Sequence, residues 1–78
     1  MSNPTINEKG HKRWENHKGF HREDGPAIEY KNGTKSWFIN GKYIYTLHTD
    51  GSTWKGDMRN IPKVTKQSII AETLKLHL

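Results

Sequence analysis

Hydrophobic and polar residues alternate in short runs along most of this chain, and turn sequences separate the runs. In the run 42–48, the alternation places Tyr43 and Tyr45 on one face of an extended strand. Ile44 and Thr46 fall on the opposite face, so we expect a sheet with one packed face and one amphipathic face. The strands predicted in this way span residues 11–16, 27–31, 35–39, 42–48 and 52–55.

The turn sequences between the runs are typical of β-hairpins. Asn32-Gly33, Asn40-Gly41 and Asp50-Gly51 favour the left-handed backbone that type I′ turns require. Pro26 follows a further turn and has no backbone N–H, so it should lie at the start of a strand or at an edge. These signals predict an antiparallel meander of short hairpins over about residues 8–58.

A helical pattern replaces the alternation near the C-terminus. Ile70, Leu74 and Leu78 recur at every fourth position and predict a helix over about residues 63–77. This apolar stripe is narrow, so we expect the helix to lie against the sheet rather than to stand alone. The predicted fold is therefore a single α+β domain, residues 1–78, that is mainly β with one C-terminal α-helix.

The hairpin region contains an internal repeat. Gly10 and Trp14 are spaced as Gly-x-x-x-Trp, and Gly33 and Trp37 repeat that spacing. A third, shortened copy begins at Asp50-Gly51-Ser52-Thr53-Trp54. Each copy predicts a turn, a strand, a turn and a second strand, with the Trp side chains in the core that neighbouring hairpins share.

A longer motif overlaps the second copy. It consists of His21-Arg22-Glu23-Asp24-Gly25-Pro26-Ala27 and, after a turn, Trp37-Phe38-Ile39-Asn40-Gly41-Lys42. This pattern resembles a repeat of small proteins from tailed bacteriophages and bacteria, and it is similar to MORN-type hairpin repeats. The match covers about residues 10–56 and departs from the repeat after Lys42, where residues 43–50 replace a second His-Arg-x-Asp-Gly-Pro-Ala. The resemblance implies a hairpin scaffold and a phage or prophage setting, but no reaction.

Composition limits both the core and the classes of site. Only 31% of the 78 residues are hydrophobic, so we expect a thin core, and a homo-oligomer is compatible with it. The chain has no cysteine, which excludes disulfides, thiol catalysis and cysteine-based zinc sites. It has no basic and apolar leader and no run of roughly 20 apolar residues. We therefore expect a cytoplasmic protein, in the host cytoplasm if phage-encoded, that does not bind a membrane.

The densest set of polar side chains surrounds His21. His21 could act as a general base oriented by Asp24, or could share a metal ion with His17 if the chain turns between them. The alternative is structural: Asp24 caps the Gly25-Pro26 turn, and Arg22 covers a Trp ring. Neither a Gly-rich phosphate loop nor a Gly-x-Ser-x-Gly elbow occurs. We favour the structural interpretation and expect no enzymatic activity, no metal and no cofactor.

Aromatic residues near basic ones favour two binding functions. The first is single-stranded nucleic-acid binding, in which rings stack on bases and basic side chains contact phosphates. The net charge of +5 agrees with it, but acidic residues are interleaved with the basic ones, which is not typical of such a face. Its aromatic residues would be the Trp residues with Tyr43 and Tyr45, and its basic residues Lys12, Arg13, Lys35 and Lys42.

The second function is protein binding, because aromatic and Arg side chains dominate the energetics of protein interfaces. Together with the phage-type resemblance, it predicts a small accessory protein that binds and inhibits or redirects a host protein, such as a defence or transcription component. We expect this function rather than nucleic-acid binding. The predicted partner-binding residues are Arg13, His21, Arg22, Lys35, Trp37 and Tyr43.

Overall fold

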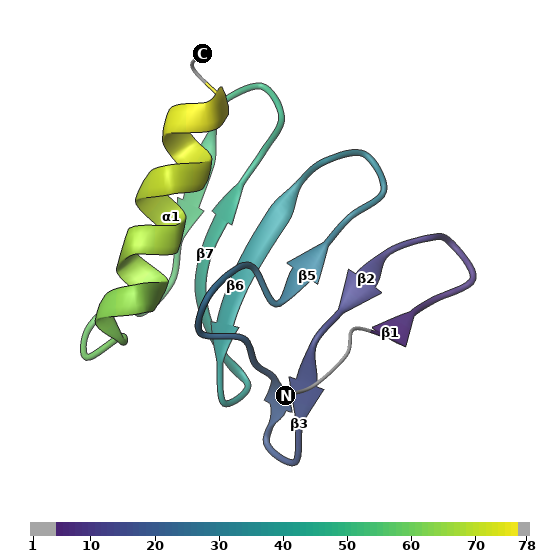
Figure 1. The fold of residues 1–78 in the computed structure, drawn as a ribbon, viewed down its shortest axis with the longest axis horizontal. Helices are drawn as coiled ribbons and strands as arrows, with labels where there is room; N and C mark the ends of the chain where they lie inside the picture. The colour runs from purple at the N-terminus through teal and green to yellow at the C-terminus, as the bar shows by residue number, and fades with distance from the viewer. Residues whose placement is uncertain (1–4, 77–78) are drawn as a thin grey trace.

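The computed structural model describes residues 5–76, which form a sheet of short strands with a helix packed against it (Figure 1). The prediction of a mainly β, antiparallel, meander-like fold with a C-terminal helix is confirmed. Within the described residues the elements are β1 (Thr5–Ile6), β2 (Lys12–Arg13), β3 (Glu15–Asn16), β4 (Gly19–Phe20), β5 (Ile28–Glu29), β6 (Lys35–Ile39), β7 (Lys42–Leu47), β8 (Thr53–Lys55) and α1 (Lys63–Leu76).

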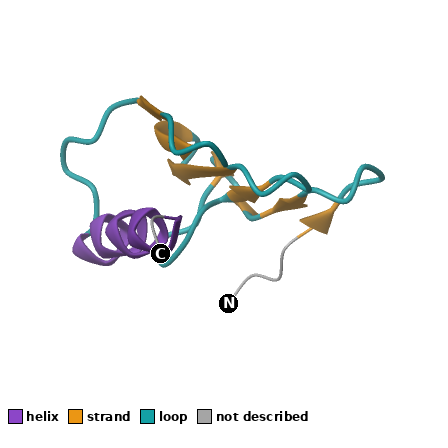
Figure 2. Ribbon diagram, turned by 90° about the horizontal axis from the view of Figure 1, so that it is seen from above, coloured by secondary structure: helices purple, strands orange, loops and turns teal. Residues whose placement is uncertain are grey.

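The main sheet has the strand order β1-β2-β5-β6-β7-β8, and its neighbouring strands are antiparallel. The hairpin of β3 and β4 leaves this sheet and forms a ribbon of its own. β2 therefore pairs with β5, the first strand after the hairpin. Figure 2 shows α1 on one side of the sheet, below the end formed by the later strands. Within residues 5–76, no helix has the length and apolar character that a membrane crossing needs.

The predicted strand 11–16 is divided in the structure at Trp14. The Trp14 N–H donates to Ala27 O (2.8 Å), and the Trp14 C=O accepts from the His21 N–H (2.9 Å). The chain changes its pairing partner at Trp14, which separates β2 from β3. β1 and β4, of 2 residues each, were not predicted.

The predicted hairpin turns form, but not all of them have the predicted type. Asn40 (φ 51°) and Gly41 (φ 81°) make a type I′ turn between β6 and β7. At the other predicted turns only the glycine has a positive φ, 97° at Gly33 and 92° at Gly51. Each is a three-residue loop that ends in a left-handed glycine, and Gly33 N–H donates to Tyr30 O (2.9 Å). The type I′ prediction is therefore wrong at these positions.

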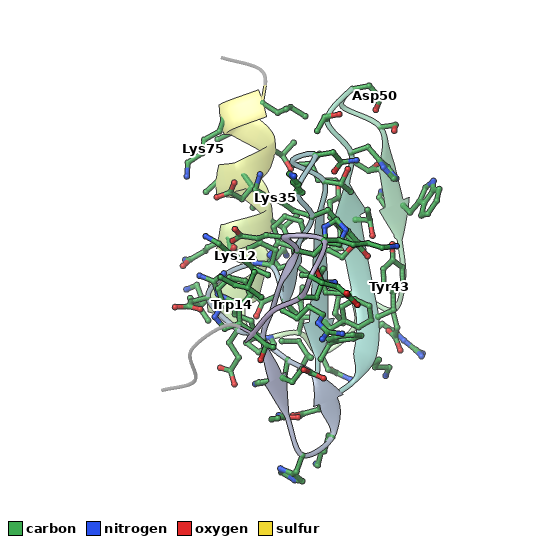
Figure 3. The ribbon with its side chains drawn as sticks, turned by 90° about the vertical axis from the view of Figure 1, so that its right-hand side faces the viewer. Lys12, Trp14, Lys35, Tyr43, Asp50 and Lys75 are labelled. Carbon is green, nitrogen blue, oxygen red and sulfur yellow. The ribbon has the colours of Figure 1, made fainter. Side chains whose placement is uncertain are left out.

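A β-bulge between β6 and β7 changes which residues share a face. Trp37 pairs with Tyr45 and Phe38 with Tyr43, so Ile44 has no partner in the ladder. The extra residue turns Ile44 onto the same face as Tyr45, where both lie in the core. Tyr43 is moved to the opposite face, which Figure 3 shows as the side away from α1. The predicted placement of Tyr43 and Tyr45 on one face is therefore wrong.

The hydrophobic core lies between the sheet and α1. Trp37 from β6 packs with Ile44, Tyr45 and Leu47 from β7 and with Ile69 from α1. All of these residues are buried. In this cluster each residue of the sheet comes from β6 or β7, and β1 and β2 extend away from it (Figure 1).

The helix spans the predicted region but buries a different stripe. Ile70 and Leu74 are 52% and 61% exposed, whereas Thr65 and Ile69 are buried. The prediction of the buried stripe is therefore wrong: the residues that face the sheet are displaced by one position around the helix from the predicted ones. Its last member, Leu78, lies outside the described residues.

Side-chain hydrogen bonds hold α1 in this orientation. Thr65 Oγ1 donates to Glu23 O at 2.7 Å, and Trp37 Nε1 donates to Ser68 Oγ at 3.2 Å. The side of the helix that faces the sheet thus carries hydroxyl groups that form half-buried hydrogen bonds with other segments. Because buried polar groups need such partners, these bonds favour the observed orientation of α1.

Ion pairs around Asp57 link the segment between β8 and α1 to the start of β7. The Asp57 carboxylate accepts hydrogen bonds from Arg59 Nε (3.1 Å) and from Lys42 Nζ (2.8 Å). The Arg59 guanidinium, helped by Lys42, holds the pKa of Asp57 well below its ordinary value of 3.8. Since the pKa is lower in the folded state than in the unfolded state, this contribution to stability is fully present above about pH 4 and is lost as the pH falls.

We expect Asp57→Asn to flatten the acid end of the stability profile. Between about pH 4 and pH 2 the wild-type melting temperature should fall more steeply than that of the variant, because the variant has no carboxylate to protonate at this position. Thermal unfolding followed by circular dichroism over this range makes the comparison. Parallel profiles for the two proteins would contradict the assignment.

Candidate binding groove

The face of the sheet opposite α1 carries a shallow groove of about 480 Å³. Its residues come from β6, β7 and β8 and from the segments next to them, and Tyr43 points into this side in Figure 3. We call this feature the open-face groove. Its lining residues are Tyr30, Asn32, Thr34, Ser36, Phe38, Tyr43, Thr46, His48 and Trp54.

The floor of the open-face groove is a chain of hydroxyl groups. Ser36 Oγ and Thr46 Oγ1 are hydrogen-bonded at 2.9 Å, and both residues are buried. Thr46 Oγ1 is also hydrogen-bonded to the Tyr43 hydroxyl. β6 and β7 pair Ser36 directly with Thr46, so the sheet itself positions these groups. The floor is therefore polar and fixed in place.

Aromatic rings form the walls, and each is held by a neighbouring ring. The Phe38 ring lies 5.4 Å from the Tyr43 ring, edge to face. On the β8 side, the His48 and Trp54 rings are 4.6 Å apart, also edge to face. Such contacts fix the rings in position, yet Trp54 remains 65% exposed. The groove thus presents preorganised aromatic surface to solvent.

Two nitrogen atoms on this side of the sheet are buried without a hydrogen-bond partner among the described residues. One is His48 Nε2, which belongs to a lining residue of the groove. The other is Arg13 Nε. Arg13 pairs with Ile28, which pairs with Ser36, so all three side chains lie on the same face of the sheet. Both atoms have almost no accessible surface, so a molecule bound in the groove does not reach them.

The predicted partner-binding residues do not form one surface. Tyr43 lines the open-face groove, and Arg13 lies on the same face. Lys35 lies on the α1 side, where its Nζ is 3.8 Å from a Glu72 carboxylate oxygen (Figure 3). Trp37 is 0% exposed, so the prediction that it contacts a partner is wrong. Trp37 lies in the core, because its position in β6 faces α1.

Arg22 has the structural role that was predicted. Its guanidinium carbon lies 4.0 Å from the centroid of the Trp14 ring. The same group bonds to Asp24 Oδ1 and to Glu29 Oε2, each at 3.2 Å. Asp24 therefore binds the Arg22 side chain, and the predicted cap of the Gly25-Pro26 turn by Asp24 is not among the hydrogen bonds of the described residues.

His21 has a structural partner at each ring nitrogen. Its Nδ1 accepts a hydrogen bond from the Asn40 N–H at 2.9 Å, and its Nε2 lies 3.4 Å from Glu23 Oε2. In the described part of the chain, the carboxylate beside His21 is thus Glu23 and not Asp24. No group of three His, Asp or Glu side chains within residues 5–76 is arranged to hold a metal ion.

The basic residues predicted to contact phosphates lie mainly away from the aromatic groove. Lys12 and Lys35 are on the α1 side of the sheet, and Tyr43 is on the other (Figure 3). Lys42 is paired with Asp57. Of the predicted basic set, Arg13 therefore lies on the face with Tyr43 and Trp54.

Several groove residues were missed by sequence reasoning. Tyr30, His48 and the Ser36–Thr46 pair carry no distinctive motif. The signal that could have found them is the alternation of side chains between the two faces of each strand, followed from one paired strand to the next. The groove combines aromatic walls with a hydroxyl floor. Comparison of the chain with protein-family models, with curated proteins and with solved structures finds no match.

Proposed function

We propose that this protein is a binding module that receives a segment of a partner protein in the open-face groove. The observation that carries the proposal is the chemistry of the lining: it contains Tyr, Trp and Phe rings but no Lys, Arg, Asp or Glu among the described residues. Protein interfaces are enriched in aromatic residues and depleted of charge at their centres. The groove has this composition on a rigid sheet.

The lining of the groove also narrows the chemistry of the partner segment. A segment with one large apolar side chain would pack between the aromatic walls, and a nearby backbone or side-chain amide would meet the polar lining residues Asn32 and Thr34. The resemblance to phage and bacterial hairpin repeats supports a host protein as the partner, which this accessory protein would inhibit or redirect.

Tyr30→Ala tests the groove without touching the core. Tyr30 lines the groove on the β5 side, so its loss should reduce capture of the partner from nuclease-treated bacterial lysate by at least about tenfold. Tagged wild-type and variant proteins are compared by quantitative mass spectrometry. The identified partner is then titrated by calorimetry with each protein.

The matched control is Val64→Ala, since Val64 is an exposed apolar residue of α1 on the other side of the sheet. It should capture as much partner as the wild type. Equal capture by Tyr30→Ala and Val64→Ala would contradict the proposal. Loss of all captured protein on nuclease treatment would contradict it as well.

Single-stranded nucleic-acid binding is the second candidate. The exposed Trp54 ring favours it, because an accessible ring can stack on a base, and Arg13 lies on the same face. In that case capture depends on nucleic acid, and the affinity for an oligonucleotide falls steeply between about 50 and 200 mM salt. A protein partner retained at the higher salt concentration distinguishes the two functions.

A further inference from the structure

β8 is an edge of the main sheet and pairs only with β7 among the described strands. At this edge, large apolar side chains are exposed on both sides of the sheet. Trp54 is 65% exposed on the open face, and on the other face Ile70 and Leu74 of α1 are 52% and 61% exposed. Figure 1 shows α1 at this end of the sheet, far from β1.

The backbone of β8 has free hydrogen-bonding groups on its outer side. Thr46 pairs with Trp54, and the flanking bonds run from His48 N–H to Ser52 O and from Gly56 N–H to Ile44 O. Residues 52, 54 and 56 therefore direct their backbone groups toward β7. In an antiparallel ladder the intervening residues point the other way, so the N–H and C=O groups of Thr53 and Lys55 face outward. Such an edge is a template for another strand.

A second groove lies beside this edge, between β8 and α1. It has a volume of about 340 Å³, and Lys55 is the one charged residue among its described lining residues. The apolar surface of the helix thus continues to the edge of the sheet. The lining residues are Tyr45, Lys55, Met58, Ile69, Ile70, Thr73 and Leu74.

We propose that a second copy of this chain binds at this edge, with the two β8 strands antiparallel and Trp54 facing the partner's Trp54. This register is the one in which all 3 residues of β8 face the β8 of the other copy. Thr53 then exchanges backbone hydrogen bonds with the partner's Lys55, using the outward groups of each. Trp54 falls at a non-hydrogen-bonded position, where opposing side chains are closest.

The charge on Lys55 selects this register. With Trp54 at the centre, Lys55 lies opposite the partner's Thr53, whereas a register centred on Lys55 would oppose two lysines and is disfavoured. The two-fold axis of such a pair runs perpendicular to the sheet. Both α1 helices therefore lie on the same face of one continuous sheet, and the groove that contains Ile70 and Leu74 faces its copy.

The proposal does not rest on the proposed function, because the edge of β8 and the open-face groove are different surfaces that share Trp54. It also accounts for a feature of the fold. The core within the described residues is small, and Trp54, Ile70 and Leu74, which are among the chain's most exposed large apolar residues, lie at the β8 edge. Small domains with thin cores often gain stability by association.

Sedimentation velocity over a range of concentrations tests the pairing. The wild type should pass from the mass of one chain to that of two as the concentration rises. Thr53→Pro should weaken the dimer by at least about tenfold, because it removes an outward N–H while leaving the bonds between β7 and β8 in place. Thr53→Val keeps that N–H and is the control, with dimerisation close to that of the wild type.

The helix side of the interface has its own pair of variants. Leu74→Asp should also abolish the dimer, because it places a charge in the apolar groove. Val64→Asp changes an exposed residue of the same helix outside that groove and should leave the dimer intact. If Thr53→Pro does not fold, Leu74→Asp and its control decide the question. Leu74→Asp should leave partner capture unchanged, and Tyr30→Ala should leave dimerisation unchanged, so failure of one proposal is distinguishable from failure of the other.

Circular dichroism tests the register itself. Two indole rings in contact give an exciton couplet, which should grow with concentration in the wild type and be absent in Trp54→Phe. A single-chain mass at every concentration overturns the proposal. A dimer that persists in both Thr53→Pro and Leu74→Asp overturns it too, and a dimer without the couplet overturns the Trp54 register.

Discussion

Replacing Trp37 with alanine is expected to lower the free energy of unfolding by about 3–5 kcal/mol. The indole is 0% exposed, lies 5.9 Å from the Tyr45 ring and donates a hydrogen bond to Ser68. Domains have only about 0.05–0.15 kcal/mol of stability per residue, so a chain this short has little margin for the loss. Urea unfolding followed by far-ultraviolet circular dichroism measures the change. The protein concentration is kept low so that association through β8 does not contribute.

The matched control is Trp54→Ala, which removes the same side chain from an exposed position. Trp54 is 65% exposed and contacts the His48 ring, so the free energy of unfolding should fall by less than about 1 kcal/mol. An equal loss in the two variants would contradict the assignment of Trp37 to the core and of Trp54 to the surface. The same pair of variants also separates stability from binding, because Trp54→Ala should keep the fold while weakening contacts at the groove and the edge.

The features that were predictable from the sequence are those with local causes. Residues 35–39 contain aromatic and β-branched residues and lie between two Asn-Gly turns, and β6 spans these residues. The glycines at the predicted hairpins adopt the left-handed backbone that only a residue without a side chain adopts readily, as at Gly33 and Gly51. The glycines of the repeat copies also share one kind of turn bond, since Gly10, Gly33 and Gly51 each donate to the carbonyl three residues earlier. The hairpin order therefore follows from short-range signals.

The features that were not predictable depend on contacts between distant segments. The bulge at Ile44 exists only once β6 and β7 are paired, yet it decides that Tyr43 faces the groove. The orientation of α1 depends on Thr65 and Ser68 meeting groups of the sheet. No periodicity within residues 63–76 contains this information, which is why the predicted helix is correct in extent and wrong in its buried face.

The candidate site was mispredicted for a related reason. Basic residues next to aromatic ones in sequence were taken to form a common surface, as with Lys42 and Tyr43 or Lys35 and Trp37. Neighbouring residues in a strand point to opposite faces, so Lys42 pairs with Asp57 while Tyr43 lines the groove. Lys35 and Trp37 are two residues apart and do share a face of β6, but that face is turned toward the core. The groove can be located only when the pairing of residues between β6, β7 and β8 is known.

Replacing Gly41 with alanine is expected to lower the free energy of unfolding by about 2–4 kcal/mol. Gly41 has a φ of 81°, which costs alanine about 1–2 kcal/mol, and an added Cβ would collide with the Lys18 carbonyl oxygen of the neighbouring hairpin. The Gly41 N–H also donates to Phe20 O at 2.8 Å, so the β6–β7 turn cannot move away from that hairpin without losing a bond. Urea unfolding measures the loss.

Gly10→Ala is the control that separates the cost of the backbone conformation from the cost of the collision with the neighbouring hairpin. Gly10 has a similar φ of 84°, but its nearest neighbour for an added Cβ is the flexible Lys31 side chain at 3.4 Å. It should therefore lose only about 1–2 kcal/mol, the cost of the backbone conformation. If Gly41→Ala is no worse than Gly10→Ala, the contact between turns does not matter to stability. A larger loss at Gly41 means that the glycine of the Asn-Gly-Lys motif is needed for hairpins to pack against each other, and not only to make a turn.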